Sequence, residues 1–133
     1  MDPSYLLFTR SLSLRDLNGP LNFPNRSLRA FHFPQGVHSI VFEALDVHNQ
    51  PFHFRLSKRR VGPHPKPVIY QALWRQYVMQ KNLREHDRVS LSMEIYSVSG
   101  RFVRYYRVIA QRRMFRLFGK DIWVNVEQLQ EPH

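Results

Sequence analysis

The apolar residues change their spacing within one stretch, residues 68–93, and this change limits what the chain can fold into. In its first half they fall near the i, i+3, i+4 spacing of a helix face: Leu73, Trp74, Tyr77, Val78 and Met79. Beyond Asn82 they alternate with polar residues, as in a strand with one buried face: Val89, Leu91, Met93 and Ile95. With the apolar run 68–70 leading in, the stretch predicts strand, short helix, tight turn and strand. The rest of the chain must supply the surface on which its aromatic residues pack.

Short alternating segments predict further strands on both sides of this unit. They lie at residues 5–10, 21–23, 38–47, 52–57, 102–111 and 122–126. Ser13 and Asp16 have the spacing of a capping box and predict one helical turn, and residues 26–33 predict two more. Aromatic residues make up 14% of the chain, which favours β structure. The pattern predicts a mainly β (α+β) domain, barrel-like or sandwich-like, with about seven short strands and two or three short helices.

Charge is the most informative global property. The 133 residues are enough for one domain, 1–133, and they carry 20 Lys and Arg against 10 Asp and Glu, a net charge of +10. Arginine outnumbers lysine, and its planar guanidinium suits phosphates and guanine edges. This balance favours a polyanionic partner, most simply nucleic acid, over a merely solvated basic surface or a patch for an acidic protein.

Neither an enzyme nor a membrane protein is predicted. The ten acidic residues are scattered, no histidines have HxxxH or HExxH spacing, and the five glycines form no phosphate-binding loop. No metal, cofactor or small-molecule substrate is expected. The chain lacks cysteine, which fits a reducing compartment, and it lacks both an apolar window of about 18 residues and a basic-then-apolar N-terminus. We therefore expect no disulfide, no membrane span and no secretory signal.

Five segments, taken in order, resemble motifs of the plant B3 DNA-binding domain family. The helix segment Trp74-xx-Tyr77-Val78 is similar to its W-xx-F-V helix, and the segment 82–90 (NLREHDRVS) is similar to its N-L-xx-G-D-x-V-S turn and strand. The other three are Leu12-Ser13-xx-Asp16-Leu17, Leu21-x-Phe23-Pro24 and Phe52-His53-Phe54-Arg55, similar to L-T-x-S-D-V, L-x-I-P and W-x-F-R. The resemblance divides the chain into a B3-like core at 5–112 and a C-terminal extension at 113–133 with an extra strand.

The resemblance implies both a fold and a mode of binding. The fold would be a seven-stranded open β-pseudobarrel, and two loop arms would bind double-stranded DNA sequence-specifically through the major groove, in a nuclear transcriptional regulator. The N-terminal arm would comprise Arg10, Ser11, Ser13, Arg15 and Asn18, with Asn25 and Arg26 beside it. The C-terminal arm would comprise Arg55, Ser57, Lys58, Arg59, Arg60 and Lys66. Arginine and asparagine can read base edges, while hydroxyls and lysines hold phosphates.

Several of these residues also have a structural interpretation. Ser13 is expected to cap its helix in preference to reading a base, and Arg15 can instead pair with Asp16. Three aromatic residues are expected in the core: Trp74, Tyr77 and Trp123. The arginines between 101 and 116 are expected on a phosphate-facing or solvated strand face. His86 stands where the family has a turn glycine and is expected to adopt a positive φ.

Three rival functions fit the same composition. The first is an OB-like barrel that binds single-stranded nucleic acid or RNA and stacks bases on Phe102, Tyr105 and Tyr106. The second is a basic protein-interaction module that meets an acidic partner or forms a homodimer through the strands at 102–126. The third is the recognition domain of a restriction enzyme, whose cleavage centre would lie on another domain or chain.

Overall fold

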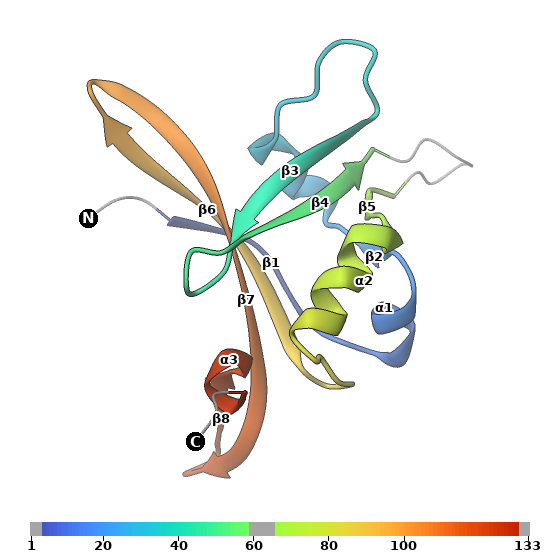
Figure 1. Ribbon diagram of the computed structural model, residues 1–133, viewed down its shortest axis with the longest axis vertical. Coiled ribbons are helices and arrows are strands. Elements are labelled where there is room, and N and C mark those ends of the chain that lie inside the picture. Colours follow the sequence, from blue (N-terminus) through green and yellow to red (C-terminus); the bar gives the residue numbers. More distant parts are fainter. Residues whose placement is uncertain (1–3, 59–65, 131–133) are drawn as a thin grey trace.

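Eight strands and four short helical elements make up residues 4–58 and 66–130, which the computed structural model describes (Figure 1). The strands are β1 (Ser4–Ser11), β2 (Leu21–Asn22), β3 (Ser39–Leu45), β4 (Pro51–Ser57), β5 (Val68–Ile69), β6 (Arg88–Val98), β7 (Arg101–Leu117) and β8 (Lys120–Asn125). The helical elements are α1 (Leu14–Asn18), the 3-10 helix η1 (Asn25–Ala30), α2 (Gln71–Gln80) and α3 (Val126–Leu129). None of the helices in these ranges is long and apolar enough to cross a membrane.

The strands form one curled sheet that does not close. Its order is β1-β6-β7-β3-β4-β5-β2, and β8 pairs with β7 outside this path. All pairs are antiparallel except β3 and β7, which run parallel. Because β1 and β2 are the two ends of the path, the barrel is open between them. The predicted open pseudobarrel of seven strands is confirmed, and β8 is added to it.

Helix α2 supplies the centre of the core, as the sequence predicts. Trp74 and Tyr77 are 2% and 0% exposed, and the Tyr77 ring meets those of Phe52 and Phe54 on β4 at 4.9 and 5.6 Å. Edge-on and tilted ring contacts then continue across the sheet through Phe42, Phe31, Phe23 and Phe8. The predicted core position of Trp123 is wrong: it is half-buried on β8, and the guanidinium of Arg88 covers its ring at 4.0 Å.

The predicted capping box begins α1. Ser13 Oγ accepts a hydrogen bond from the backbone N–H of Asp16 at 3.1 Å, and Asp16 Oδ2 accepts one from the backbone N–H of Ser13 at 3.0 Å. The indole Nε1 of Trp74 donates to the backbone carbonyl of Asp16 at 2.7 Å. The short α1 is therefore fixed at its start by its own cap and laterally by α2.

Two elements differ from the prediction. The helix expected at 26–33 is the 3-10 helix η1, in which the N–H of Ser27 bonds to the carbonyl of Pro24 three residues back. The strand expected at 102–111 continues to Leu117, because β7 pairs first with β6 and, from Gln111 onwards, with β8. Figure 1 shows the two resulting hairpins, β6–β7 and β7–β8, extending from the body in different directions.

Candidate nucleic-acid interface

The short pair of β2 and β5, at the edge of the sheet, joins the ends of the two predicted arms. Two antiparallel residue pairs connect these strands: Leu21 with Ile69, and Asn22 with Val68. The N-terminal arm leads into β2 and the C-terminal arm leads into β5 (Figure 1). A hydrogen bond from the N–H of Phe23 to the carbonyl of Pro67, 2.9 Å long, extends the contact past the strands. Both arms therefore end at one place on the molecule.

Lys58 is the residue of the C-terminal arm that directly follows β4. Its Nζ lies 4.4 Å from the centre of the Phe33 ring, a cation–π contact that fixes the side chain against the segment after η1. Its backbone N–H donates to the carbonyl of His38 at 2.8 Å. Together the two contacts hold the Lys58 ammonium group close to the sheet.

The other residues of the C-terminal arm are in different positions. Arg55 is exposed on β4, where its NH1 donates to Ser39 Oγ at 3.3 Å, and Lys66 is exposed two residues before β5. Ser57 does not lie on the surface: although predicted as a contact, it is 5% exposed where β4 is paired on both sides, with β3 and with β5. Arg59 and Arg60 lie outside the described residues.

Two residues of the N-terminal arm form hydrogen bonds with other residues of the same arm. Arg10 donates from Nε and NH2 to the two carboxylate oxygens of Asp16, both at 2.9 Å, and Ser13 caps α1. The alternative pairing of Arg15 with Asp16 is wrong, since Asp16 is taken by Arg10. Arg15 itself is exposed and makes no hydrogen bond or ion pair within residues 4–58 and 66–130.

The remaining residues of the N-terminal arm are exposed. Ser11 ends β1, and Asn18 ends α1. The side-chain amide of Asn18 donates to the carbonyl of Leu14 at 2.9 Å, and its own carbonyl accepts from Gln71 Nε2 at 2.8 Å. Since Gln71 follows β5 almost directly, this bond joins the N-terminal arm to the end of the β2–β5 pair.

Asn25 and Arg26 are exposed on the first turn of η1, close to the opening of the barrel. A hollow of about 230 Å³ lies at this opening, lined by Phe8, Thr9, Arg10, Asn22, Phe23 and Pro24. Sequence reasoning did not single out Thr9 and Asn22. The alternation of Leu21, Asn22 and Phe23 is the signal that could have found Asn22, because the two apolar neighbours are buried and turn the amide outward.

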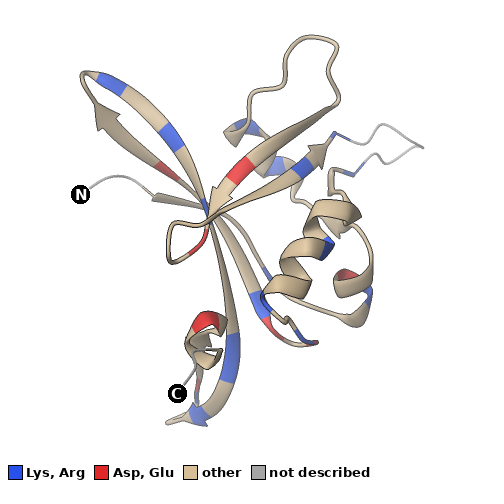
Figure 2. Cartoon of the chain, in the orientation of Figure 1, with Lys and Arg blue, Asp and Glu red and all other residues tan. Residues whose placement is uncertain are grey.

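Acidic residues are largely absent from the segments that form this face. Residues 17–42 and 47–84 contain no Asp or Glu, and they include β2, η1, β4, β5 and α2. Figure 2 shows the basic positions on η1 and along β4. The buried or half-buried carboxylates each have a cationic partner: Asp16 with Arg10, Asp46 and Glu127 with Lys81, Asp87 with Arg112, and Glu94 with Arg107. The exposed arginines of η1 and β4 therefore have no acidic residue within their own segments.

Three of these paired carboxyls have pKa values below their ordinary range. Burial raises the pKa of Asp16, but the hydrogen bonds from Arg10 and Ser13 lower it by more. Burial likewise raises the pKa of Asp46, and the bonds from Lys81, Gln50 and His48 outweigh it. The hydrogen bond from Arg107 lowers the pKa of Glu94. These groups stay ionised at neutral pH and neutralise structural cations.

The side chains considered for base stacking do not form one platform. Tyr106 stacks on Phe31, with ring centres 4.5 Å apart, and its hydroxyl donates to the carbonyl of Ala30. Tyr105 packs edge-on against Tyr96 at 5.1 Å. Phe102 is 82% exposed near the end of the β6–β7 hairpin. A row of free aromatic faces, which a single-strand binder needs, is therefore missing from these three positions.

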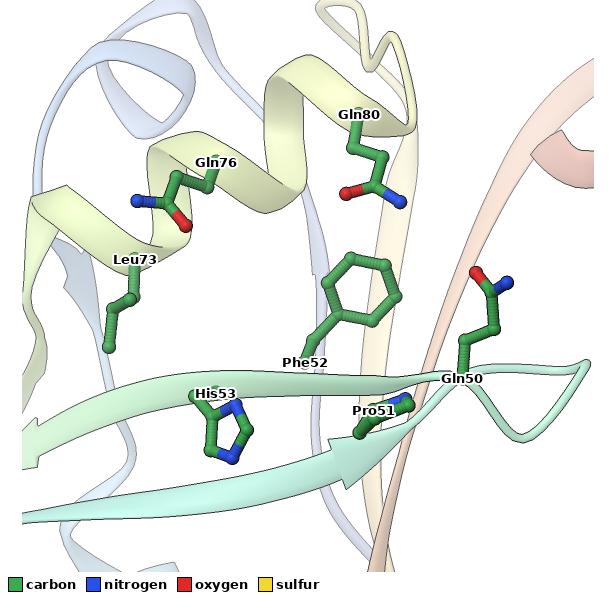
Figure 3. Close-up of a pocket in the computed structure, with 7 residues that line it drawn as sticks. All are labelled: Gln50, Pro51, Phe52, His53, Leu73, Gln76 and Gln80. Carbon is green, nitrogen blue, oxygen red and sulfur yellow. The ribbon is translucent and has the colours of Figure 1, made fainter.

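A further hollow lies between β4 and α2 (Figure 3). It has a volume of about 330 Å³ and is lined by Gln50, Pro51, Phe52, His53, Leu73, Gln76 and Gln80. Its polar side chains are three neutral amides and one imidazole, and the carboxylate beside that imidazole, Glu43 at 3.7 Å from His53 Nε2, lies outside the lining of the hollow. Across the described ranges, no group of three or more His, Asp or Glu is placed to hold a metal ion.

Known proteins match this chain in structure and not in sequence. No protein-family model and no curated protein matches the sequence. Among solved structures, the Arabidopsis FUS3–DNA complex is similar, with a TM-score of 0.50 and 16% sequence identity over 77% of this chain and 96% of that chain. At this identity the similarity is one of fold, and it supports the B3-like open barrel that the sequence motifs predict.

Proposed function

We propose that this protein binds double-stranded DNA sequence-specifically, with its two arms in the major groove, and acts in the nucleus as a transcriptional regulator. The observation that carries the proposal is the meeting of both arms at the β2–β5 pair, whose two strands lie in segments without acidic residues. The similarity of fold to a protein solved as a complex with DNA supports it. A basic face of this kind attracts a duplex through its phosphates before any base is read.

The arm residues that reach solvent, wholly or in part, divide into two roles. Arg15 and Asn25 have side chains able to read base edges, since Arg bonds to guanine O6 and N7 and Asn to adenine N6 and N7. Lys58 and Lys66 hold phosphates and fix the register of the duplex. Arg10 and Ser13 support α1 from within and act on DNA through the position of the arm.

Selection from a pool of randomised duplexes tests specificity, and a salt series on the selected duplex tests the phosphate contacts. We expect one motif to be enriched and affinity to fall steeply with salt, by a slope of about 0.9 for each phosphate neutralised. Fluorescence anisotropy on the same sequence as a single strand should give weaker binding. A pool that stays random, together with a flat salt response, would remove the proposal.

A protein-interaction module is the second candidate, and the hairpins favour it. Phe102 and Phe118 are 82% and 94% exposed at the ends of β6–β7 and β7–β8. Large exposed aromatic side chains often mark contacts with a protein partner. Indifference to every nucleic acid, combined with a dimer in sedimentation, would favour this function over DNA binding.

A further inference from the structure

Arg26 and Arg29 lie on the same side of η1. A 3-10 helix has three residues in each turn, so side chains three positions apart are eclipsed. Both arginines are exposed, and both line the same hollow at the side of β1. The 3-10 geometry therefore places the two guanidinium groups in line on one face, whereas an α-helix would offset them by about 60° around its axis.

The helix that carries this pair is fixed to the sheet at its middle and at its end. Ser27 is buried, and its hydroxyl donates to the carbonyl of Leu7 on β1 at 2.6 Å. The carbonyl of Ala30 accepts from the Tyr106 hydroxyl and, at 3.2 Å, from Arg104 NH1. These bonds hold the backbone of η1 in place, so that little backbone entropy is lost when the two guanidinium groups bind a ligand.

The hollow that they border combines apolar and cationic groups. It has a volume of about 460 Å³, and its remaining lining includes Tyr5, Leu6, Leu7 and Met93. A deoxyribose–phosphate unit has the matching chemistry, because the sugar presents C–H groups and the phosphate accepts hydrogen bonds from guanidinium forks. The segment 17–42 that carries both arginines has no acidic residue to neutralise them.

This hollow continues the candidate interface along one strand. Residues 5–7 of β1 line it, and residues 8–10 of the same strand line the hollow at the barrel opening. Arg26 lies two residues after the segment 22–24 that borders the barrel opening. A nucleic-acid backbone that leaves the arms along β1 therefore passes the two arginines.

We propose that Arg26 and Arg29 together hold a backbone phosphate of the bound duplex beyond the two arms, with the adjoining sugar against Tyr5 and Met93. The inference rests on the proposed function and adds to it a contact that reads no base. Arg29 is the new residue in this contact, and the acid-free run around it is the sequence signal that could have found it.

Methionine methyl NMR locates the contact directly. The full chain is labelled with [methyl-13C]methionine and titrated with the selected duplex, or with a random-sequence duplex if no motif is enriched. We expect the Met93 methyl to shift along the binding curve, while Met79 on α2 and Met114 on β7, 70% and 47% exposed, stay unchanged. Binding without a shift at Met93 would overturn this contact and leave the proposed function standing. A wild-type chain that binds no duplex would overturn both.

Charge substitutions provide the second readout. Arg29→Ala should lower the salt slope by about 0.9, the value for one phosphate, without changing the enriched motif. Arg101→Ala makes the same change of charge at the exposed start of β7, next to the turn of the β6–β7 hairpin, and should leave the slope unchanged. Equal losses from both variants would mean a general effect of net charge and would rule out the phosphate contact. An altered motif with Arg29→Ala would assign this residue to base reading instead.

Discussion

Arg10 donates two hydrogen bonds of 2.9 Å to the carboxylate of Asp16, which lies six residues further along the chain. The Asp16 side chain is 5% exposed and the Arg10 side chain 38%, so the arginine shields the carboxylate from solvent. The same carboxylate caps α1, and the carbonyl of Asp16 accepts from Trp74. One residue thus joins the end of β1, the start of α1 and the core helix α2.

Removing the Arg10 side chain is expected to destabilise the fold. Arg10→Ala leaves a nearly buried carboxylate without its charged partner, and we expect the free energy of unfolding to fall by about 1–3 kcal/mol. Arg15→Ala, at an exposed position five residues on, should stay within about 0.5 kcal/mol of the wild type and weaken DNA binding instead. Urea denaturation separates the two effects. Equal stability of both variants would contradict the structural role of Arg10.

Lys81 should be even more important to stability. Its ammonium group is buried between Asp46 at 2.7 Å and Glu127 at 2.9 Å, and so joins the β3–β4 turn to α3. Lys81→Met leaves both carboxylates without their cation, and we expect a loss of about 3–5 kcal/mol. Lys120→Met, at an exposed position on β8, is the matched control and should change little. A Lys81→Met protein with wild-type urea midpoint would show that the buried cluster adds nothing.

Stability should fall in acid because of Asp16, Asp46 and Glu94, whose pKa values are lowered in the folded state. In the unfolded chain they return to about 3.9 for Asp and about 4.3 for Glu. Each contribution is complete above the unfolded value and is lost as the pH falls through the folded one. We therefore expect urea midpoints to decline below about pH 4. Asp46→Asn should be less stable at neutral pH and lose less on acidification. If the urea midpoint of Asp46→Asn declined with pH as steeply as that of the wild type, the role of Asp46 in acid stability would be refuted.

His86 offers a way to stabilise the protein. Its φ is 75°, in the left-handed region, and its side chain is 84% exposed. Since this region costs a residue with Cβ roughly 1–2 kcal/mol, we expect His86→Gly to raise the free energy of unfolding by about 0.5–1 kcal/mol. Glu85→Gly, at the preceding exposed position, has no such strain to relieve and should lower it. Thermal or urea unfolding of both proteins decides the matter, and a loss of stability in both would show that His86 is not strained.

Much of the local structure was predictable, because it depends on neighbours in the sequence. The helical spacing around Trp74, the capping box of Ser13 and the positive φ of His86 were all predicted and are present. Strand positions followed from alternation in the same way. The order of the motifs also predicted the open barrel, which the sheet and the similarity to a solved structure bear out.

The sequence alone determined the short-range geometry and the excess of positive charge, since turns, caps and periods are set within a few residues. The tertiary structure alone decided which side chains pair with one another, which are buried and which strands lie side by side. It paired Asp16 with Arg10 in place of Arg15, buried Ser57, extended β7 by giving it a second partner, and placed Trp123 under Arg88. The physical reason is that partners such as Lys81 and Asp46, 35 residues apart, are chosen by where the sheet folds back on itself, which no local pattern records.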